Sequence, residues 1–271
     1  IAASTNIIAT RVSNTVSALF NATFGNAMEF FIAIFALSHG LVEMVKASIV
    51  GSIIINVLLL VGLAMIFGGT KYKEQKFNKN SAGLSSTMLI IVVVGLVMPS
   101  LYSMLKGQPA EAMSQAVSVV LGIIYLLSLL YVLVTHKQLF VVERGARHGR
   151  SPRAAIGILL GSTIMAGFEA SFLVDTVDPI IRQTGLTEPF IGLVLIALLT
   201  NIPEHVSAIS FARKDNITLS MDIGMNSATQ IALFVVPVLV LVSNAFLASP
   251  LDLVFTPFEL AAVMITAIIA N

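Results

Sequence analysis

Two acidic side chains occur inside long apolar stretches, and each follows an asparagine by three residues. The stretch FGNAMEFF contains Asn26 and Glu29, and LTNIPEHV contains Asn201 and Glu204. This spacing puts amide and carboxylate about one turn apart on the same face of a helix. An acidic residue at the centre of a bilayer costs about 2.5–3.5 kcal/mol on insertion scales, so its retention indicates function. We therefore predict a site built around the two glutamates.

Further polar residues repeat after each glutamate. Ser52 and Asn56 follow the first glutamate in IVGSIIINVLL, and Ser227 and Gln230 follow the second in IGMNSATQIAL. The serine comes 23 residues after its glutamate in both cases, and the amide comes 27 and 26 residues after it. Each set offers a carboxylate, an amide, a hydroxyl and backbone carbonyls, which is the oxygen chemistry that Ca²⁺ prefers. Na⁺ is the second choice of ion.

Softer metals fit this set of residues less well. The chain has no cysteine, which excludes disulfides and thiolate metal sites. His205 points about 100° around the helix from Glu204, so the pair is not a zinc motif. Two carboxylates can neutralise one divalent ion, and each prefers a proton to a bare charge once the ion has left. Competition between Ca²⁺ and protons for this pair predicts antiport.

Proline is unexpected at the centre of an apolar helix. Pro203 has no backbone N–H, and its ring clashes with the carbonyl of Leu199. A carbonyl freed inside a membrane needs a partner, which can be protein, water or a cation. We expect the helix to be broken around Pro203, and Gly25 to loosen the first glutamate's helix in a similar way.

The elements that must position these residues are membrane-spanning helices. The chain is 57% hydrophobic and only 11% charged, far from the composition of soluble domains. Several apolar runs reach about 20 residues, enough to cross a bilayer. We predict eight spans: 19–38, 45–67, 84–105, 112–135, 154–174, 190–211, 217–243 and 257–270.

Most of the 15 basic residues fall in or before alternate loops. Arg11 precedes the first span, four lysines lie in the second loop, five basic residues in the fourth, and Arg213 and Lys214 in the sixth. Acidic residues gather in or beside the odd-numbered loops. By the positive-inside rule the basic loops are cytoplasmic. Asp222, near the cytoplasmic end of its span, fits a snorkelling or vestibule role.

With this topology the first and sixth spans run in opposite directions across the membrane. Matching polar residues on oppositely oriented helices indicate an inverted-topology repeat, whose substrate site lies near the midplane. The predicted fold is an all-α polytopic membrane protein with two inverted helical repeats and the ion site between them. We expect a first half at 1–135, a basic cytoplasmic linker at 136–153 and a second half at 154–271.

The two motif pairs also resemble those of the Ca²⁺/cation antiporter superfamily. GNAMEFF with VGSIIINVLLL, and TNIPEHVSAI with NSATQIALF, are most similar to the cation/proton exchanger branch. Thr200 and Pro203 replace the glycine and alanine usual there, and the proline is more like the Na⁺/Ca²⁺ branch. Na⁺/Ca²⁺ exchange on the same scaffold therefore stays an alternative.

The resemblance implies two inverted five-helix halves and an extra N-terminal helix, so we expect that helix and the final one to lie outside this sequence. It implies Ca²⁺/H⁺ exchange by alternating access, with Glu29 and Glu204 as shared ion and proton ligands. His205 matches the family's histidine and joins them in proton coupling. The implied supporting ligands are Asn26, Ser52 and Asn56 for the first glutamate, and Asn201, Ser227 and Gln230 for the second.

Other functions are less consistent with the sequence. An intramembrane hydrolase would need a motif such as HExxH or a nucleophile with its base, and neither occurs in the spans, so we expect no enzyme. A Ca²⁺-selective channel would need a ring of like residues. We expect Ca²⁺ and H⁺ as substrates, no cofactor, no nucleic-acid partner, and a lipid environment. That environment is the cell membrane of a prokaryote or a vacuolar-type membrane of a eukaryote, and a homo-oligomer is among the assemblies the sequence allows.

Overall fold

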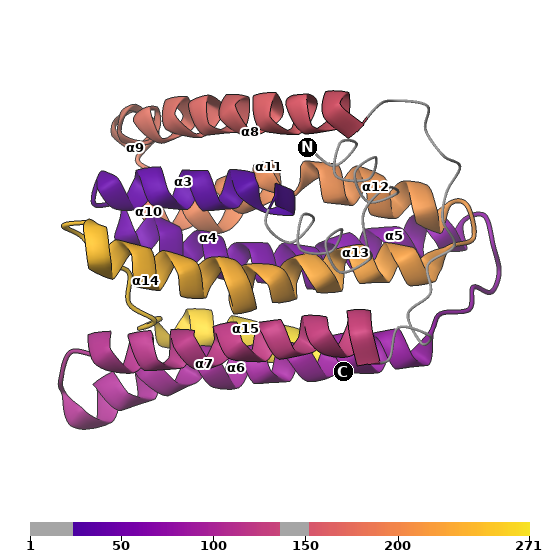
Figure 1. Ribbon diagram of the computed structural model, residues 1–271, viewed down its shortest axis with the longest axis horizontal. Coiled ribbons are helices and arrows are strands. Elements are labelled where there is room, and N and C mark those ends of the chain that lie inside the picture. The colour runs from indigo at the N-terminus through magenta and orange to yellow at the C-terminus, as the bar shows by residue number, and fades with distance from the viewer. Residues whose placement is uncertain (1–23, 136–151) are drawn as a thin grey trace.

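The computed structural model describes residues 24–135 and 152–271, and its regular structure there is entirely helical (Figure 1). This confirms the all-α prediction. The helices are α3 (Ala27–Ser38), α4 (Val42–Ile54), α5 (Val61–Gly69), α6 (Lys79–Lys106), α7 (Glu111–Leu130), α8 (Pro152–Asp175), α9 (Val177–Thr184), α10 (Glu188–Phe190), α11 (Ala197–Thr200), α12 (Ile202–Ala212), α13 (Ile217–Gln230), α14 (Val236–Phe246) and α15 (Pro257–Ala270). Short π-helical segments interrupt them at η1 (Ile55–Leu60), η2 (Tyr131–Thr135), η4 (Ile191–Ile196) and η5 (Ile231–Val235).

Many of these helices are long and apolar enough to cross a membrane. Among the described residues five qualify by length and hydropathy, and the pair Glu188–Thr200 and Ile202–Ala212 adds a sixth if counted as one bent span. Their outward faces carry apolar side chains such as Ile90, Phe172 and Phe246. A water-facing surface would not be so apolar over such lengths, whereas lipid requires it. The protein is a multi-pass membrane protein.

The predicted spans agree with these helices in most places. The first prediction, 19–38, lies partly outside the described residues, and the part described ends with the 12-residue helix α3. Helix α9 was missed, because its charged Asp178 and Arg182 made the segment read as a loop. Val177 is buried, and Ile180 and Ile181 pack against the core, so one apolar face stabilises this short amphipathic helix.

The connections gather at two opposite ends of the helix bundle (Figure 1). At one end, which we call the basic end, residues 70–78 meet residues 213–216: Lys71 Nζ donates to the Arg213 carbonyl at 3.0 Å, and Gln75 Nε2 to Asp215 Oδ1 at 3.1 Å. At the opposite end His39 Nε2 lies 3.5 Å from Asp175 Oδ1. Alternate loops therefore share an end, as the charge pattern predicted. The basic linker predicted at 136–153 lies almost wholly outside the described residues.

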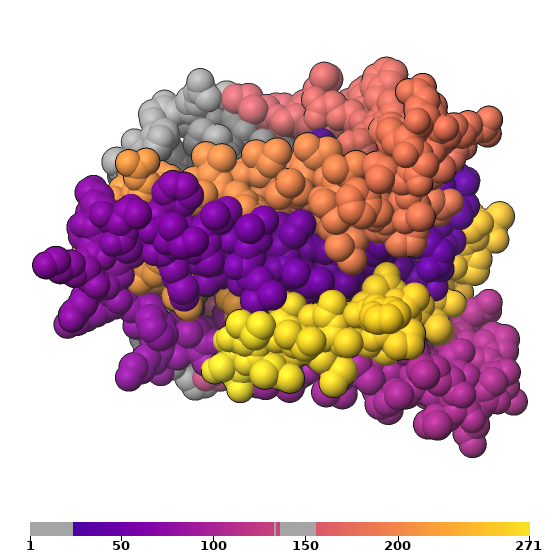
Figure 2. Space-filling model, turned by 180° about the vertical axis from the view of Figure 1, so that it is seen from behind, coloured from indigo at the N-terminus to yellow at the C-terminus, as the bar shows by residue number. Residues whose placement is uncertain are grey.

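The helices that carry the repeated motifs pack against one another at the centre of the bundle. Helix α4 contacts α10 and η4, and α12 packs against both α5 and α13. Seen from behind, the α4–α5 helix lies between the α10–α12 region and α15 (Figure 2). A Cβ on Gly51 would overlap the Leu193 carbonyl, so glycine lets the α4 and η4 backbones touch. Helices from the first and the second half of the sequence thus pack around one common centre.

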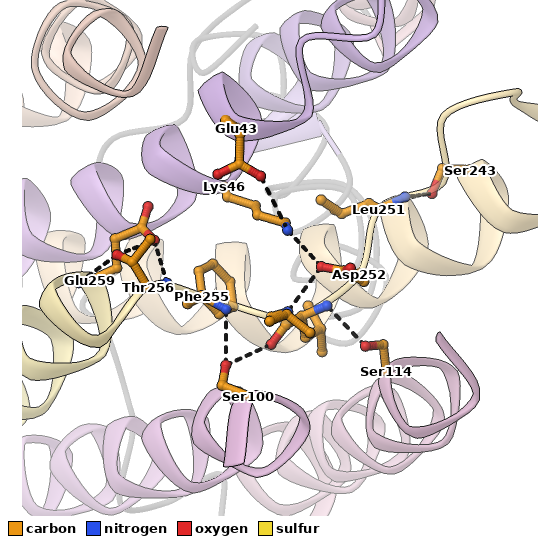
Figure 3. A network of polar contacts seen from close by, with 12 residues as sticks. Glu43, Lys46, Ser100, Ser114, Ser243, Leu251, Asp252, Phe255, Thr256 and Glu259 are labelled. Atoms are coloured by element: carbon orange, nitrogen blue, oxygen red, sulfur yellow. Dashed lines mark hydrogen bonds and ion pairs between the residues drawn. The ribbon is translucent and has the colours of Figure 1, made fainter. Parts of the chain in front are cut away.

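A non-helical segment, residues 247–256, joins α14 to α15 at the end opposite the basic end (Figure 1), and Figure 3 shows its polar contacts. Ser100 Oγ accepts from the Phe255 N–H at 2.9 Å, and Ser114 Oγ accepts from the Leu253 N–H at 2.9 Å. Lys46 Nζ lies 2.6 Å from Asp252 Oδ1, with only 8% of the lysine side chain exposed. This buried ion pair attaches the segment to α4.

Candidate ion-binding site

Both glutamate-bearing helices are broken at an asparagine. Asn26 has φ −103° and ψ 27° and precedes α3, and Asn201 has φ −96° and ψ 6° and precedes α12. At Asn201 the two helix segments meet at an angle of 51°. Each glutamate therefore lies in the first turn of a new helix, where free backbone N–H groups and the helix dipole favour negative charge.

The predicted break exists, but its position corrects the role given to the proline. Pro203 occupies the first turn of α12, where the missing N–H breaks no hydrogen bond within the helix. Asn26 shows that the same break forms without a proline. At the second break Asn201 Nδ2 donates to the Ala197 carbonyl at 2.8 Å. The asparagine side chain itself thus satisfies a backbone group that the break releases.

The predicted amides and hydroxyls meet, and they pair between the two halves. Asn26 Nδ2 donates to Gln230 Oε1 at 3.0 Å. Asn56 Nδ2 donates to Asn201 Oδ1 at 2.6 Å and to Ser227 Oγ at 3.1 Å, and Asn201 Nδ2 donates to Ser52 Oγ at 3.3 Å. Apart from Gln230, all of these side chains are buried. Residues 204 and 145 positions apart in sequence thus form one polar centre.

The two glutamates lie at the edge of this centre. Both are half-buried. The Glu29 carboxyl lies beside the Thr200 hydroxyl and close enough to Glu204 for direct electrostatic interaction. Glu204 Oε2 is fully buried and has no hydrogen-bond partner among the described residues, and the same is true of Asn56 Oδ1. Buried oxygens without a hydrogen-bond partner need an explanation. The simplest one is that a bound cation or water interacts with them.

His205 is buried beside the second break. Its Nδ1 lies 2.7 Å from the Asn201 carbonyl oxygen. Because a carbonyl can only accept, Nδ1 carries the proton in this contact. Nε2 is buried without a partner among the described residues. The imidazole therefore holds the carbonyl of the asparagine at which the helix bends.

Some features of the site were not predicted. η1 begins one residue before Asn56, and η5 begins directly after Gln230, so a π-helical segment lies at the equivalent point of both halves. Such segments are common at functional sites. Thr200 was noted in the sequence only as a departure from the family pattern, yet its hydroxyl lies beside the Glu29 carboxyl. The described residues contain no cluster of three or more His, Cys, Asp or Glu, so any metal bound here must rely on amide and hydroxyl oxygens as well.

Comparisons with known proteins agree with this picture. A family model described as "Sodium/calcium exchanger protein" matches residues 1–134 and 154–271. The "Ca(2+)/H(+) antiporter" of Aphanothece halophytica is 36% identical over 98% of this chain and 77% of its own length. The "Ca(2+)/H(+) antiporter ChaA" of Bacillus subtilis is 37% identical over 94% of this chain and 74% of its own. The solved "Structure of native YfkE" is 33% identical, with a TM-score of 0.82 over 99% of this chain and 80% of that one.

Two broken helices in inverted orientation, with polar side chains paired across them, define a membrane transporter of the inverted-repeat type. The chain belongs to the sodium/calcium exchanger protein family. The resemblance drawn from the two motif pairs is thereby confirmed, including its cation/proton exchanger branch.

Proposed function

We propose that this protein is a secondary transporter that exchanges Ca²⁺ for H⁺, and is not an enzyme. Relatives at 36% and 37% identity over most of the chain carry the name Ca²⁺/H⁺ antiporter. The observation that carries the proposal is the arrangement of Glu29 and Glu204. They come from helices broken in the same way in the two halves, and they lie within electrostatic range beside amides and hydroxyls from both halves.

Ca²⁺ and protons would compete for these carboxylates. A bound Ca²⁺ is neutralised by two carboxylates and completed by neutral oxygens, of which Asn56 Oδ1 is buried and unpartnered among the described residues. When the ion leaves, two like charges in a poorly solvated centre repel, and binding protons relieves this repulsion. The same pair then binds either the ion or protons, which is the requirement for antiport.

The crosswise hydrogen bonds connect this chemistry to movement between the halves. Asn26 of the first half pairs with Gln230 of the second, and Asn201 of the second half pairs with Asn56 of the first. A displacement of one half against the other changes both pairs at once. In this proposal His205 is a positioning residue for proton coupling, because it holds the carbonyl at the bend one turn before its own position.

We also infer that the basic end faces the cytoplasm. Residues 70–79 contain four lysines, and Arg213 and Lys214 lie in the loop beside them. Basic residues in short loops favour the cytoplasmic side.

Ca²⁺-driven proton movement in vesicles tests the proposed exchange directly. The purified full-length protein is reconstituted into Na⁺-free vesicles that contain a pH-sensitive dye and have an acidic interior. Adding Ca²⁺ outside is expected to raise the interior pH, with and without a membrane voltage clamp. Ca²⁺ uptake that requires Na⁺ inside the vesicles and leaves the interior pH unchanged would contradict the proposal and favour Na⁺/Ca²⁺ exchange. A Ca²⁺ current that leaves the interior pH unchanged would favour a channel.

A further inference from the structure

A polar stripe runs along the contact between α6 and α13, from the basic end toward the ion site. On α13 it consists of Asp222, Asn226 and Gln230, spaced by four residues and therefore on one helix face. On α6, Ser81 and Ser85 have the same spacing. Ser81 Oγ donates to Asp222 Oδ1 at 2.7 Å. From Asp222 to Gln230 the rise is about 12 Å, so the stripe covers much of one leaflet.

A cavity of about 230 Å³ opens along this stripe. It lies between α6, the α7–η2 helix and the α13–η5 helix. Among the described residues its lining contains no charged side chain and includes six polar ones: Ser85, Tyr125, Ser128, Asn226, Thr229 and Gln230.

Two of these polar groups, Tyr125 and Asn226, lie in a mostly apolar part of the helix bundle. The Tyr125 hydroxyl is buried and has no hydrogen-bond partner among the described residues, while its ring packs on Phe234 at 5.4 Å. Asn226 is exposed although it lies in the middle of a membrane helix. Facing lipid, an amide would lose its hydrogen bonds at a cost of several kcal/mol. A cavity of this size has room for several waters at about 30 Å³ each, and these waters supply hydrogen-bond partners for the exposed Asn226 amide.

The cavity also reaches the candidate ion site. Gln230 lines it and at the same time accepts the hydrogen bond of Asn26 at 3.0 Å. Asn26 is one turn before Glu29. At the other end of the stripe Asp222 supplies a negative charge near the basic end, bonded to Ser81. Between them, the lining residues within 24–135 and 152–271 carry no positive charge that would repel a cation.

We propose that this chamber between α6, α7 and α13 is an aqueous passage that connects the ion site with the basic end, with the Asp222 carboxylate attracting cations at its mouth. The passage rests on the proposed function for its purpose, because an exchanger needs a route for Ca²⁺ and protons. Its existence, however, depends only on water reaching the chamber, and this can be measured whichever ion is transported.

These 271 residues contain no cysteine, so single cysteines can be introduced here into the full-length protein, with any cysteine outside them replaced by serine. Ser85→Cys and Asn226→Cys are placed in the chamber. Ser86→Cys is the matched control, because Ser86 is a neighbour on the same helix, is equally buried at 7%, and bonds Asn271 instead of lining the chamber. Each variant is treated in sealed vesicles of known orientation with membrane-impermeant methanethiosulfonates, one cationic and one anionic, from either side.

We expect the two chamber cysteines to react an order of magnitude faster than Ser86→Cys, and only from the basic end. The cationic reagent should be preferred, and adding Asp222→Asn should remove that preference. Equal labelling rates at Ser85→Cys and Ser86→Cys, or labelling from the opposite end, would contradict the proposed passage. A preference unchanged by Asp222→Asn would overturn the role of Asp222. Since labelling needs no transport, these results are independent of whether Ca²⁺/H⁺ exchange is observed.

Discussion

Asn201 makes hydrogen bonds to both halves from the point where its helix bends. Its amide nitrogen reaches Ser52 Oγ and the Ala197 carbonyl, and its amide oxygen accepts from Asn56. An asparagine can do this because it carries two donors and an acceptor on a short side chain. The break in the helix and the contact between halves therefore depend on the same side chain.

Replacing Asn56 tests how much this pairing stabilises the protein. Asn56 is fully buried and donates to both Asn201 and Ser227. Asn56→Ala leaves buried acceptors without their donor, so we expect a loss of roughly 1–3 kcal/mol, measured by unfolding in detergent. Asn80→Ala, at an exposed asparagine in the first turn of α6, is the control and should change little. Equal stability of the two variants would contradict this account.

At the scale of elements, the α4–η1–α5 and α13–η5–α14 helices are built in the same way. Each runs as a single long apolar helix with a π-helical segment beside its candidate ligands. Each is also closely approached by the other half, since a Cβ on Gly51 would overlap the Leu193 carbonyl and one on Gly224 the Asn56 carbonyl. Because the backbones are in such close contact, a larger residue does not fit at Gly51 or Gly224 without a shift of the neighbouring helix.

Gly51→Ala should therefore destabilise the protein. The added methyl group meets backbone atoms that cannot move aside independently, and overpacking of this kind costs roughly 1–3 kcal/mol. Gly62→Ala is the control in the same long helix, because its added Cβ meets no atom within 4 Å apart from the neighbouring backbone of its own helix. That control should be neutral or slightly stabilising. The test is the melting temperature of both variants in detergent. An unchanged melting temperature for Gly51→Ala would contradict the close α4–η4 backbone contact.

The ion pair of Lys46 and Asp252 should stabilise the end opposite the basic end. Removing one partner of a buried pair costs roughly 3–5 kcal/mol, and the loss for Lys46→Met should lie below this range because Asp252 is 34% exposed. The double variant Lys46→Met/Asp252→Asn should recover part of the loss, because the only carboxylate it leaves without the lysine is that of Glu43, which is 56% exposed and stays solvated. A double variant less stable than Lys46→Met alone would contradict this explanation. Unfolding in detergent provides both values.

The sequence predicted those parts of the structure that depend on local pattern. Apolar runs located most helices, and the repeated spacing of polar residues located the candidate site. The break at Asn201 was attributed to Pro203, because a proline is a strong local signal while an asparagine that bonds its own backbone is not. The crosswise pairing, the ion pair of Lys46 and the chamber beside Tyr125 depend on contacts between distant segments, which no local pattern encodes.

At the scale of the whole molecule, side chains from residues 24–135 and 152–271 form one polar centre that neither segment could form alone. Each half supplies one glutamate, and the amide beside each break pairs with the opposite half. In an exchanger this arrangement makes the site sensitive to the relative position of the halves. Both glutamates are then required, and loss of either should abolish exchange rather than halve it.

The most direct test is ⁴⁵Ca²⁺ uptake into Na⁺-free proteoliposomes driven only by an acidic interior. The full-length protein, Glu29→Gln, Glu204→Gln and the control Glu111→Gln are compared; Glu111 is an exposed glutamate in the first turn of α7. We expect uptake by the unmodified protein and the control, and none by either site variant. Uptake by Glu29→Gln or Glu204→Gln at the control's rate would contradict the claim that the two carboxylates together bind Ca²⁺ and protons.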